Sequence, residues 1–310
     1  MDNKALKSNL LLLLAAIIWG FAFVAQREGM EHIGPFLFNA IRFALGSLVL
    51  IPFLFKSYPI VHSKKILYTE KSFYLYGLIA GILLYFGSAA QQAGLVYTTA
   101  GKAGFITGLY MVFVPIFGLF IRQKTSFYAW VGVIVAAIGL YLLSISNELT
   151  IQFGDLLELI SAIVWAVQVL FIGRVSPRIN AIHLAFFQFI ICSVLNFVTT
   201  LFYEPIILSE ISGAIPSLLY AGFLSVGIGY TLQVVAQKDA HPSHAAILMS
   251  LESVFALIGG WLLLNEMISL KEFIGCILMF SGMIISQLSI LKTYFRKRKP
   301  PIYQHPNLSK

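Results

Sequence analysis

Two charged side chains stand inside long apolar stretches of this sequence: Arg42, within residues 34–55, and Glu252, within residues 243–265. A charge at the centre of a bilayer costs about 2.5–3.5 kcal/mol on insertion scales, so a compensating interaction is needed. A desolvated carboxyl can exchange a proton or hold a substrate ammonium, and a guanidinium can hold a carboxylate through two hydrogen bonds. Either residue could instead serve assembly, Glu252 by pairing with a neighbouring helix and Arg42 by binding helix-end carbonyls or Glu252.

A polar stripe accompanies these charges. Glu158, Ser161, Trp165 and Gln168 follow one another at steps of three or four residues, which places them on one face of a helix. Polar groups would be unsatisfied against lipid, so we expect this face to turn inward. Hydrogen bonds between packed helices would explain any single member of the stripe equally well.

Aromatic side chains with polar atoms complete the candidate site. Trp19 and Trp165 lie near the middle of their apolar stretches rather than at the ends, where tryptophans in membrane proteins concentrate. Together with the glutamines they predict a pocket for an amphipathic metabolite. The predicted substrate-binding set is Trp19, Arg42, Gln91, Tyr110, Trp165, Gln168, Gln233 and Glu252, with Glu252 also as the proton-coupling group.

Other kinds of chemistry find little support. His241 and His244 flank Pro242, but no set of acids or cysteines completes a metal site around them, so we expect no metal. The sequence has no phosphate-binding Gly-x-x-x-x-Gly-Lys-Ser/Thr loop, so we expect no nucleotide or other cofactor.

A membrane enzyme acting on a lipid-linked substrate could use Glu252 or His183, but ionisable groups are sparse and scattered in depth. We expect no enzyme, and a non-transporting assembly or sensor subunit would need a partner domain that the short loops do not offer.

The composition explains where these residues must sit. Of the 310 residues 59% are hydrophobic and only 11% are charged, with a mean hydropathy of +0.87. An ordinary soluble domain is about half apolar and about a quarter charged. These values exclude a standard cytosolic enzyme and a disordered chain, and indicate an all-α integral membrane protein.

Ten apolar stretches are predicted to be transmembrane helices, since about 20 residues are needed for each crossing. Short connections separate them, and none is long enough to form a domain. The stretches are 8–27, 34–55, 73–96, 99–121, 127–145, 155–174, 181–203, 213–237, 243–265 and 270–291.

The basic residues predict the orientation. If the N-terminus is cytoplasmic, 17 of the 21 Lys and Arg residues fall in cytoplasmic segments, as the positive-inside rule requires. This distribution accounts for the net charge of +8 without a nucleic-acid partner. We therefore expect a multi-pass protein of the cell membrane with both termini cytoplasmic, and a basic, disordered tail over 292–310. The sequence leaves open whether it is a monomer or a homodimer.

The two halves of the chain resemble each other. The segment Ala16-Ile17-Ile18-Trp19 matches Ala162-Ile163-Val164-Trp165, 146 residues later. Gly87 and Gln91 match Gly229 and Gln233, 142 residues later. Each half holds five predicted helices, and an odd number makes the second copy enter the membrane from the opposite side. That is the inverted repeat of many secondary transporters, whose binding site lies at the midplane between the repeats.

These residues also carry a resemblance to a known family. Trp19-Gly20 in the first predicted helix, Arg42 in the second and the stretch 251–256 (LESVFA) resemble tandem EamA domains of the drug/metabolite transporter superfamily. The resemblance covers about residues 8–291. Ser253 replaces the proline of the family pattern, and Tyr110 stands where the second copy has Glu252. Lys124 stands where the first copy should have its closing Glu.

The resemblance implies two five-helix repeats, 8–145 and 155–291, and transport of a small metabolite by alternating access. Similar proteins export amino acids and other metabolites, and Arg42 opposite Glu252 would suit a zwitterion. An amino-acid exporter, possibly coupled to protons, is therefore the first expectation. A permease for drugs or nucleobase-like metabolites is the alternative.

Overall fold

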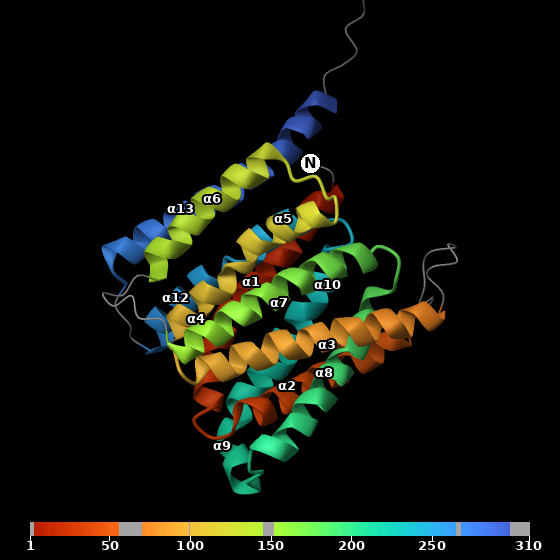
Figure 1. Ribbon diagram of the computed structural model, residues 1–310, viewed down its shortest axis with the longest axis vertical. Helices are drawn as coiled ribbons and strands as arrows, with labels where there is room; N and C mark the ends of the chain where they lie inside the picture. The colour runs from red at the N-terminus through yellow and green to blue at the C-terminus, as the bar shows by residue number, and fades with distance from the viewer. Residues whose placement is uncertain (1–2, 56–69, 99, 145–151, 265–267, 298–310) are drawn as a thin grey trace, which may run out of the picture.

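The computed structural model describes residues 3–55, 70–98, 100–144, 152–264 and 268–297. Helices make up nearly all of this part of the chain, and no strand occurs in it (Figure 1). The all-α prediction is confirmed. Long, mainly apolar runs of residues form these helices, because a helix satisfies its own backbone hydrogen bonds in lipid.

The first half of the chain forms six helical elements, each at or near a predicted stretch. They are α1 (Asn3–Gly29), α2 (Pro35–Leu54), α3 (Glu70–Leu95), α4 (Ala100–Gly108), α5 (Tyr110–Phe120) and α6 (Phe127–Ser144).

The second half forms seven α-helices and one π-helix. They are α7 (Phe153–Val175), α8 (Ala181–Tyr203), α9 (Leu208–Leu219), the π-helix η1 (Tyr220–Tyr230), α10 (Thr231–Ala236), α11 (Pro242–Met249), α12 (Glu252–Leu264) and α13 (Leu270–Lys297). Because α13 runs to Lys297, residues 292–297 of the expected disordered tail are helical, and 298–310 lie outside the described residues.

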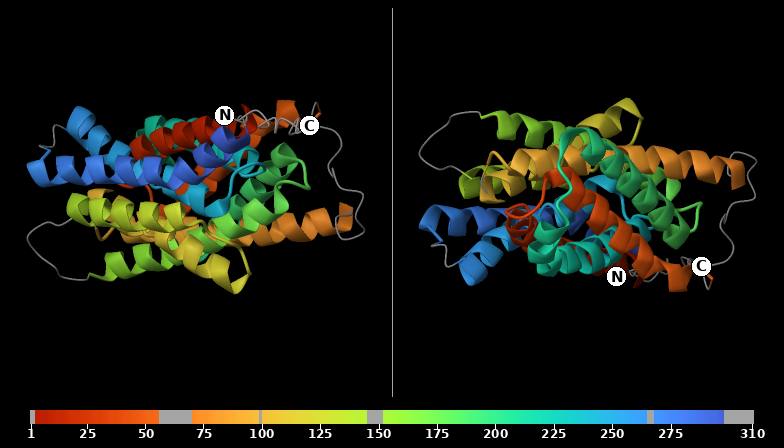
Figure 2. Two further views of the ribbon diagram at one scale, coloured as in Figure 1. Left: turned by 90° about the horizontal axis from the view of Figure 1, so that it is seen from above. Right: turned by 90° about the horizontal axis from the view of Figure 1, so that it is seen from below.

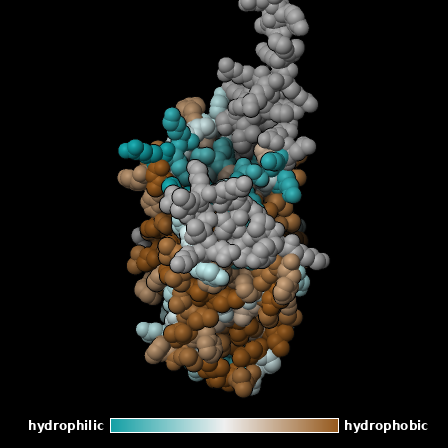
Figure 3. All heavy atoms as spheres, turned by 90° about the vertical axis from the view of Figure 1, so that its right-hand side faces the viewer, coloured by the Kyte–Doolittle hydropathy of each residue, from teal (hydrophilic) through white to brown (hydrophobic). Residues whose placement is uncertain are grey.

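Eight helical segments in the described part of the chain are long and apolar enough to cross a membrane. Two further apolar helices, Phe127–Leu142 and Phe273–Ser286, are shorter. The chain is therefore an integral, multi-pass membrane protein, while the predicted number of ten crossings is not confirmed. Figure 3 shows hydrophobic residues over the middle and lower part of one face and hydrophilic residues gathered above them.

Two predicted helices are broken. Residues 99–121 form α4 and α5, with the break at Leu109, and residues 243–265 form α11 and α12, with the break at Ser250 and Leu251. The two breaks lie at matching places in the sequence repeat. Pro115 lies within α5, C-terminal to the break, so the break does not coincide with the proline.

Helices from the two halves pack against one another. In Figure 2, α1 and α12 share one layer, and α3 and α7 share the other. At one edge α6 lies along α13 (Figures 1 and 2). Glycines allow this close approach, because a Cβ at Gly132 would lie 2.6 Å from the Gly282 carbonyl oxygen, and a Cβ at Gly282 would lie 2.6 Å from the Gly132 oxygen.

Candidate functional site

A cavity of about 460 Å³, including its open mouth, lies between helices of both halves. Helices α1, α2, α3, α4, α5, α7, α10, α11 and α12 and the π-helix η1 each contribute to its wall. The lining residues are Trp19, Phe23, Gln26, Arg42, Gln91, Thr107, Tyr110, Trp165, Val169, Ser225, Tyr230, Gln233, Met249 and Glu252.

Seven of the eight residues predicted from the sequence line this cavity. The eighth, Gln168, lies behind the wall, where its Oε1 accepts a hydrogen bond of 3.0 Å from Nε2 of Gln233. The structure therefore brings the predicted set together around one space, and the binding roles of its members stay predictions.

The break between α11 and α12 positions Glu252. The residue begins α12, so its carboxyl lies in the first helical turn, where the helix dipole favours negative charge. Its side chain is buried, and the hydroxyl of Tyr110 on α5 lies beside it. The Tyr110 hydroxyl has no hydrogen-bond partner among the described residues.

Arg42 is positioned by contacts with residues of its own helix, α2. Its Nε donates a hydrogen bond of 2.7 Å to Oδ1 of Asn39, whose own Nδ2 donates to the Ser88 carbonyl oxygen at 3.0 Å. The guanidinium carbon lies 5.0 Å from the ring centroid of Phe43, within cation–π range. Among the residues that the structure describes, Nη2 has no hydrogen-bond partner. Arg42 and Glu252, both described, form no ion pair with each other, so the expectation that they neutralise one another finds no support.

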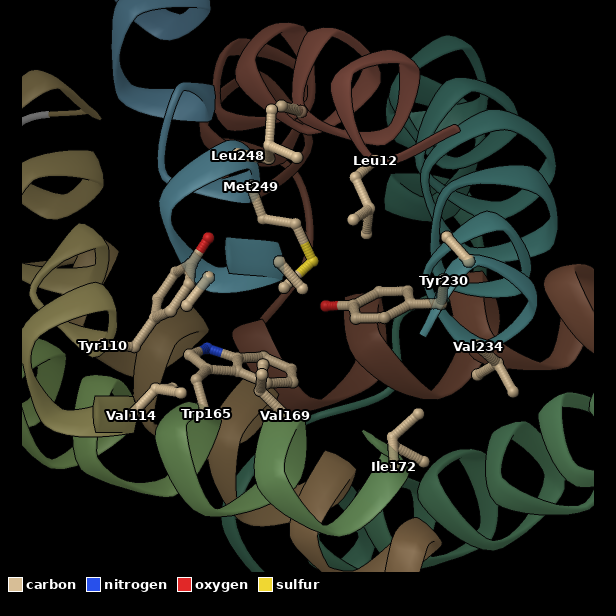
Figure 4. Packing of buried hydrophobic residues seen from close by; sticks show 14 of the residues in the cluster. Leu12, Tyr110, Val114, Trp165, Val169, Ile172, Tyr230, Val234, Leu248 and Met249 are labelled. Atoms are coloured by element: carbon tan, nitrogen blue, oxygen red, sulfur yellow. The ribbon is translucent and has the colours of Figure 1, made fainter. Parts of the chain in front are cut away.

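Tyr230 is a cavity residue that the sequence did not reveal. Its ring lies 5.8 Å from that of Trp165 at 28°, and 4.8 Å from that of Trp19 at 51°. It lies within electrostatic range of both Arg42 and Glu252. Figure 4 shows Tyr110, Trp165, Tyr230 and Met249 pointing toward one another from four different elements. Tyr230 stands three residues before Gln233, a spacing that places two residues on the same face of a helix.

Each of the two cavity tryptophans packs closely against a glycine. A Cβ at Gly87 would lie 3.1 Å from the ring of Trp165, and a Cβ at Gly229 would lie 2.6 Å from Nε1 of Trp19. Trp19 also donates a hydrogen bond of 3.2 Å to the Ser225 carbonyl oxygen. Each tryptophan thus rests on a glycine of the other half, at positions that the sequence repeat relates.

Six further lining residues were not predicted from the sequence: Phe23, Gln26, Thr107, Val169, Ser225 and Met249. Five of them are apolar or small and resemble ordinary helix residues, so nothing in their types marks them. Gln26 donates a hydrogen bond of 3.0 Å to the Ala22 carbonyl oxygen of its own helix. The cavity wall is therefore mixed: aromatic and apolar side chains with a small number of polar groups between them.

Two histidines lie near the start of α11, and one of them, His241, caps this helix. Nδ1 of His241 accepts a hydrogen bond of 3.3 Å from the Ser243 backbone N–H, which caps the N-terminus of α11. Burial lowers the pKa of His241, which favours the neutral ring that a cap acceptor requires. Its ring centroid lies 5.8 Å from that of His244.

Comparison with known proteins gives consistent results. An uncharacterized transporter of Archaeoglobus fulgidus is 32% identical over 299 residues, which is 93% of this chain and 88% of that protein. The uncharacterized transporter YoaV of Bacillus subtilis is 26% identical over 93% of this chain and 97% of its own. A Salmonella typhimurium protein named "probable amino-acid metabolite efflux pump" is 25% identical over 90% of this chain and 94% of its own.

A protein of known crystal structure shares the fold, with a TM-score of 0.73 over 92% of this chain and 98% of that chain, at 18% sequence identity. The sequence profile of the EamA-like transporter family matches twice, over residues 6–145 and 152–288. Family and relatives are transporters, and none of these names indicates an enzyme. The chain belongs to the EamA-like transporter family of the drug/metabolite transporter superfamily.

Proposed function

We propose that this chain is a secondary-active exporter of a small zwitterionic metabolite, with an amino acid as the first candidate. The observation that carries the proposal is one cavity lined by a buried guanidinium and a buried carboxyl that do not pair with each other. A buried charge needs a partner, and an α-amino acid offers a carboxylate to Arg42 and an ammonium to Glu252. The name of the Salmonella relative supports the same substrate class.

In this proposal the carrier works by alternating access of two five-helix repeats, 8–145 and 155–291, with ten crossings and both termini cytoplasmic. The reciprocal seats of Trp19 and Trp165 support the repeat, as do the helix breaks at matching positions. The excess of Lys and Arg in the expected cytoplasmic segments supports the orientation, with the cell membrane as location. The chain works as a monomer or a homodimer.

Glu252 is also the proton-coupling group of this proposal. A carboxyl that holds an ammonium in one step and a proton in another lets a proton gradient drive export. The nearby hydroxyl of Tyr110 supports this role, because it can rotate to donate to the charged form of Glu252.

A matched ligand series tests the substrate class. The purified protein is screened by thermal shift with the proteinogenic amino acids, with their decarboxylated amines and with their deaminated acids. A ligand that binds the folded state raises the melting temperature. We expect the intact amino acid to stabilise the protein more than either truncated form, and Glu252→Gln to abolish the advantage of the amino acid over the deaminated acid. Equal stabilisation by the amine alone would contradict the zwitterion proposal.

The aromatic cage favours a second candidate function. Trp19, Trp165 and Tyr230 together present ring faces that attract organic cations and stack on planar heterocycles. A permease for cationic drugs or nucleobase-like metabolites would use these rings and Glu252 without Arg42. In the same screen, quaternary ammonium dyes and nucleobases would then raise the melting temperature, and Arg42→Gln would leave that shift unchanged.

A further inference from the structure

A second buried carboxyl, Glu158, lies outside the cavity wall. It belongs to α7, two turns before Trp165, and its side chain is fully buried. Oε2 accepts a hydrogen bond of 2.7 Å from Oγ1 of Thr107, and Oε1 has no partner. A buried carboxylate that has no counter-ion and lacks hydrogen-bond donors for one oxygen can become neutral by binding a proton.

Gly94 on α3 makes the space for this carboxyl. A Cβ at Gly94 would lie 3.0 Å from Oε1 of Glu158 and 3.0 Å from the Gly154 carbonyl oxygen. Glu158 Oε1 therefore lies against Gly94, and no donor of the described residues reaches it. A buried carboxyl oxygen without a donor favours the neutral, protonated form of the group.

Thr107 connects this niche to the central cavity. Its hydroxyl donates to Glu158, and the residue itself lines the cavity. Gln91, also a lining residue, donates from Nε2 to the same hydroxyl oxygen at 3.5 Å. Glu158 is thus one side chain away from the space in which Glu252 lies.

On its other side Glu158 adjoins the N-terminal end of α7. Asp155, one turn earlier, accepts hydrogen bonds from Thr98 at 3.1 Å and from the Gln152 backbone N–H at 2.8 Å. Gln152 is exposed. Of the described side chains, Asp155 on α7 and Glu252 on α12 are the ionisable groups that act on Glu158, while α3 and α4 face it with Gln91 and Thr107. Both ionisable neighbours are acids, so neither neutralises it.

We propose that Glu158 is a second proton-binding site of the carrier, connected to the central cavity through the hydroxyl of Thr107. This inference deepens the proposed function and rests on it, because the proton it holds is the coupling ion. When Glu252 releases a proton into the cavity, water carries it to Oγ1 of Thr107. The Thr107 hydroxyl proton passes at the same time to Oε2 of Glu158, so one O–H bond forms on Glu158 and the hydroxyl is restored. The reverse transfer returns the proton.

Proton binding is measured directly by infrared titration of the purified protein, without any transported ligand. The carbonyl stretch of a protonated carboxyl is followed against pH in the wild type, Glu158→Gln and Glu252→Gln. We expect two titrating buried bands in the wild type, of which each variant loses one. A Glu158→Gln spectrum that titrates as the wild type does would overturn the proposal.

Thr107 provides a matched pair of variants in case Glu158→Gln does not fold. Thr107→Val keeps the shape and removes the hydroxyl, while Thr107→Ser keeps the hydroxyl. We expect the valine variant to shift the Glu158 band and the serine variant to leave it in place. Identical bands in both variants would show that Thr107 does not contact the proton-binding group, which contradicts the connection.

Transport separates this inference from the proposed function. Proteoliposomes containing a pH-sensitive dye receive a mixture of the proteinogenic amino acids, and proton movement is recorded beside amino-acid exchange. We expect Glu158→Gln to lose at least tenfold in proton movement while exchange continues, and Thr107→Val to lose proton movement to a similar extent. If the wild type moves amino acids and protons and both variants do so equally well, the Glu158 inference is wrong. If the wild type moves neither, the proposed function fails first.

Discussion

The two halves of this protein place different chemistry on the same scaffold. In the first half the residue that follows the helix break is Tyr110, and in the second half it is Glu252. Arg42 on α2 stands 146 residues before Gln188 on α8, an offset that also relates Trp19 to Trp165. The packing around these positions is repeated, whereas the charges are not.

This difference has a consequence for binding. A cavity with the same charges in both halves would present two acids or two guanidinium groups, which repel each other and suit a symmetric ligand. Here each half supplies one charge of opposite sign, Arg42 from the first and Glu252 from the second. The cavity therefore has a direction, and a ligand with separated charges can bind in one orientation.

Removing the charge of the second half should have the largest effect. We expect Glu252→Gln to weaken amino-acid binding by roughly ten- to a hundredfold, because a hydrogen bond to a charged group contributes about 1.5–3 kcal/mol. Isothermal titration of the purified protein measures this, with the exposed Glu210→Gln on α9 as the matched acid control. Unchanged affinity in Glu252→Gln would place the ammonium group elsewhere.

Removing the charge of the first half should act on a different part of the ligand. We expect Arg42→Gln to weaken binding of the amino acid about tenfold, near the lower end of what a charge-assisted contact contributes, since Tyr230 and Gln233 remain as donors. The decarboxylated amine should bind the variant as well as it binds the wild type. Equal losses for both ligands would indicate that Arg42 supports the fold and not the carboxylate.

The shared packing can be tested at the tryptophan seats. Gly229→Ala places a Cβ 2.6 Å from Trp19 Nε1, and Gly87→Ala places one 3.1 Å from the Trp165 ring. We expect Gly229→Ala to destabilise by about 1–3 kcal/mol, as overpacked cores do, and Gly87→Ala by less. Both variants should lower the melting temperature, in that order. The opposite order would contradict the reciprocal seating of the two rings.

The sequence predicted the helices well, because long apolar stretches separated by short polar connections leave little choice of structure in a membrane. It did not predict the breaks at Leu109 and Leu251. The proline in the first of these helices lies elsewhere, and no proline stands inside the second beyond its first turn. Near the two breaks, Ser253 donates a hydrogen bond to the Gly104 carbonyl oxygen and Ser250 donates one to the Met111 sulfur. Such contacts between the halves have no local signal in the sequence.

The candidate site could be predicted only in part, because contacts between distant segments have no local signal in the sequence. Charged and aromatic residues in apolar stretches stand out, so Arg42, Glu252 and Trp165 could be found from their types alone. Gln168 shares a predicted helical face with Trp165, yet it lies behind the cavity wall, since a face is wider than the part of it that meets the cavity. Tyr230 was not predicted, although it stands three residues before Gln233, a spacing that places two residues on one face of a helix.

The smallest expected effect concerns Gln188, the counterpart of Arg42. Its side chain is fully buried and does not line the cavity, and neither its Oε1 nor its Nε2 has a hydrogen-bond partner in the described part of the chain. An unsatisfied buried polar group costs about 1–3 kcal/mol, so Gln188→Leu, of similar volume, should leave the melting temperature unchanged or raise it. Amino-acid affinity should stay as in the wild type, because at this pair of positions only the first half, with Arg42, supplies a charge to the cavity. Lost affinity with an intact fold would mean that the second half uses this position for binding as well, and the cavity would then be more symmetric than its charges indicate.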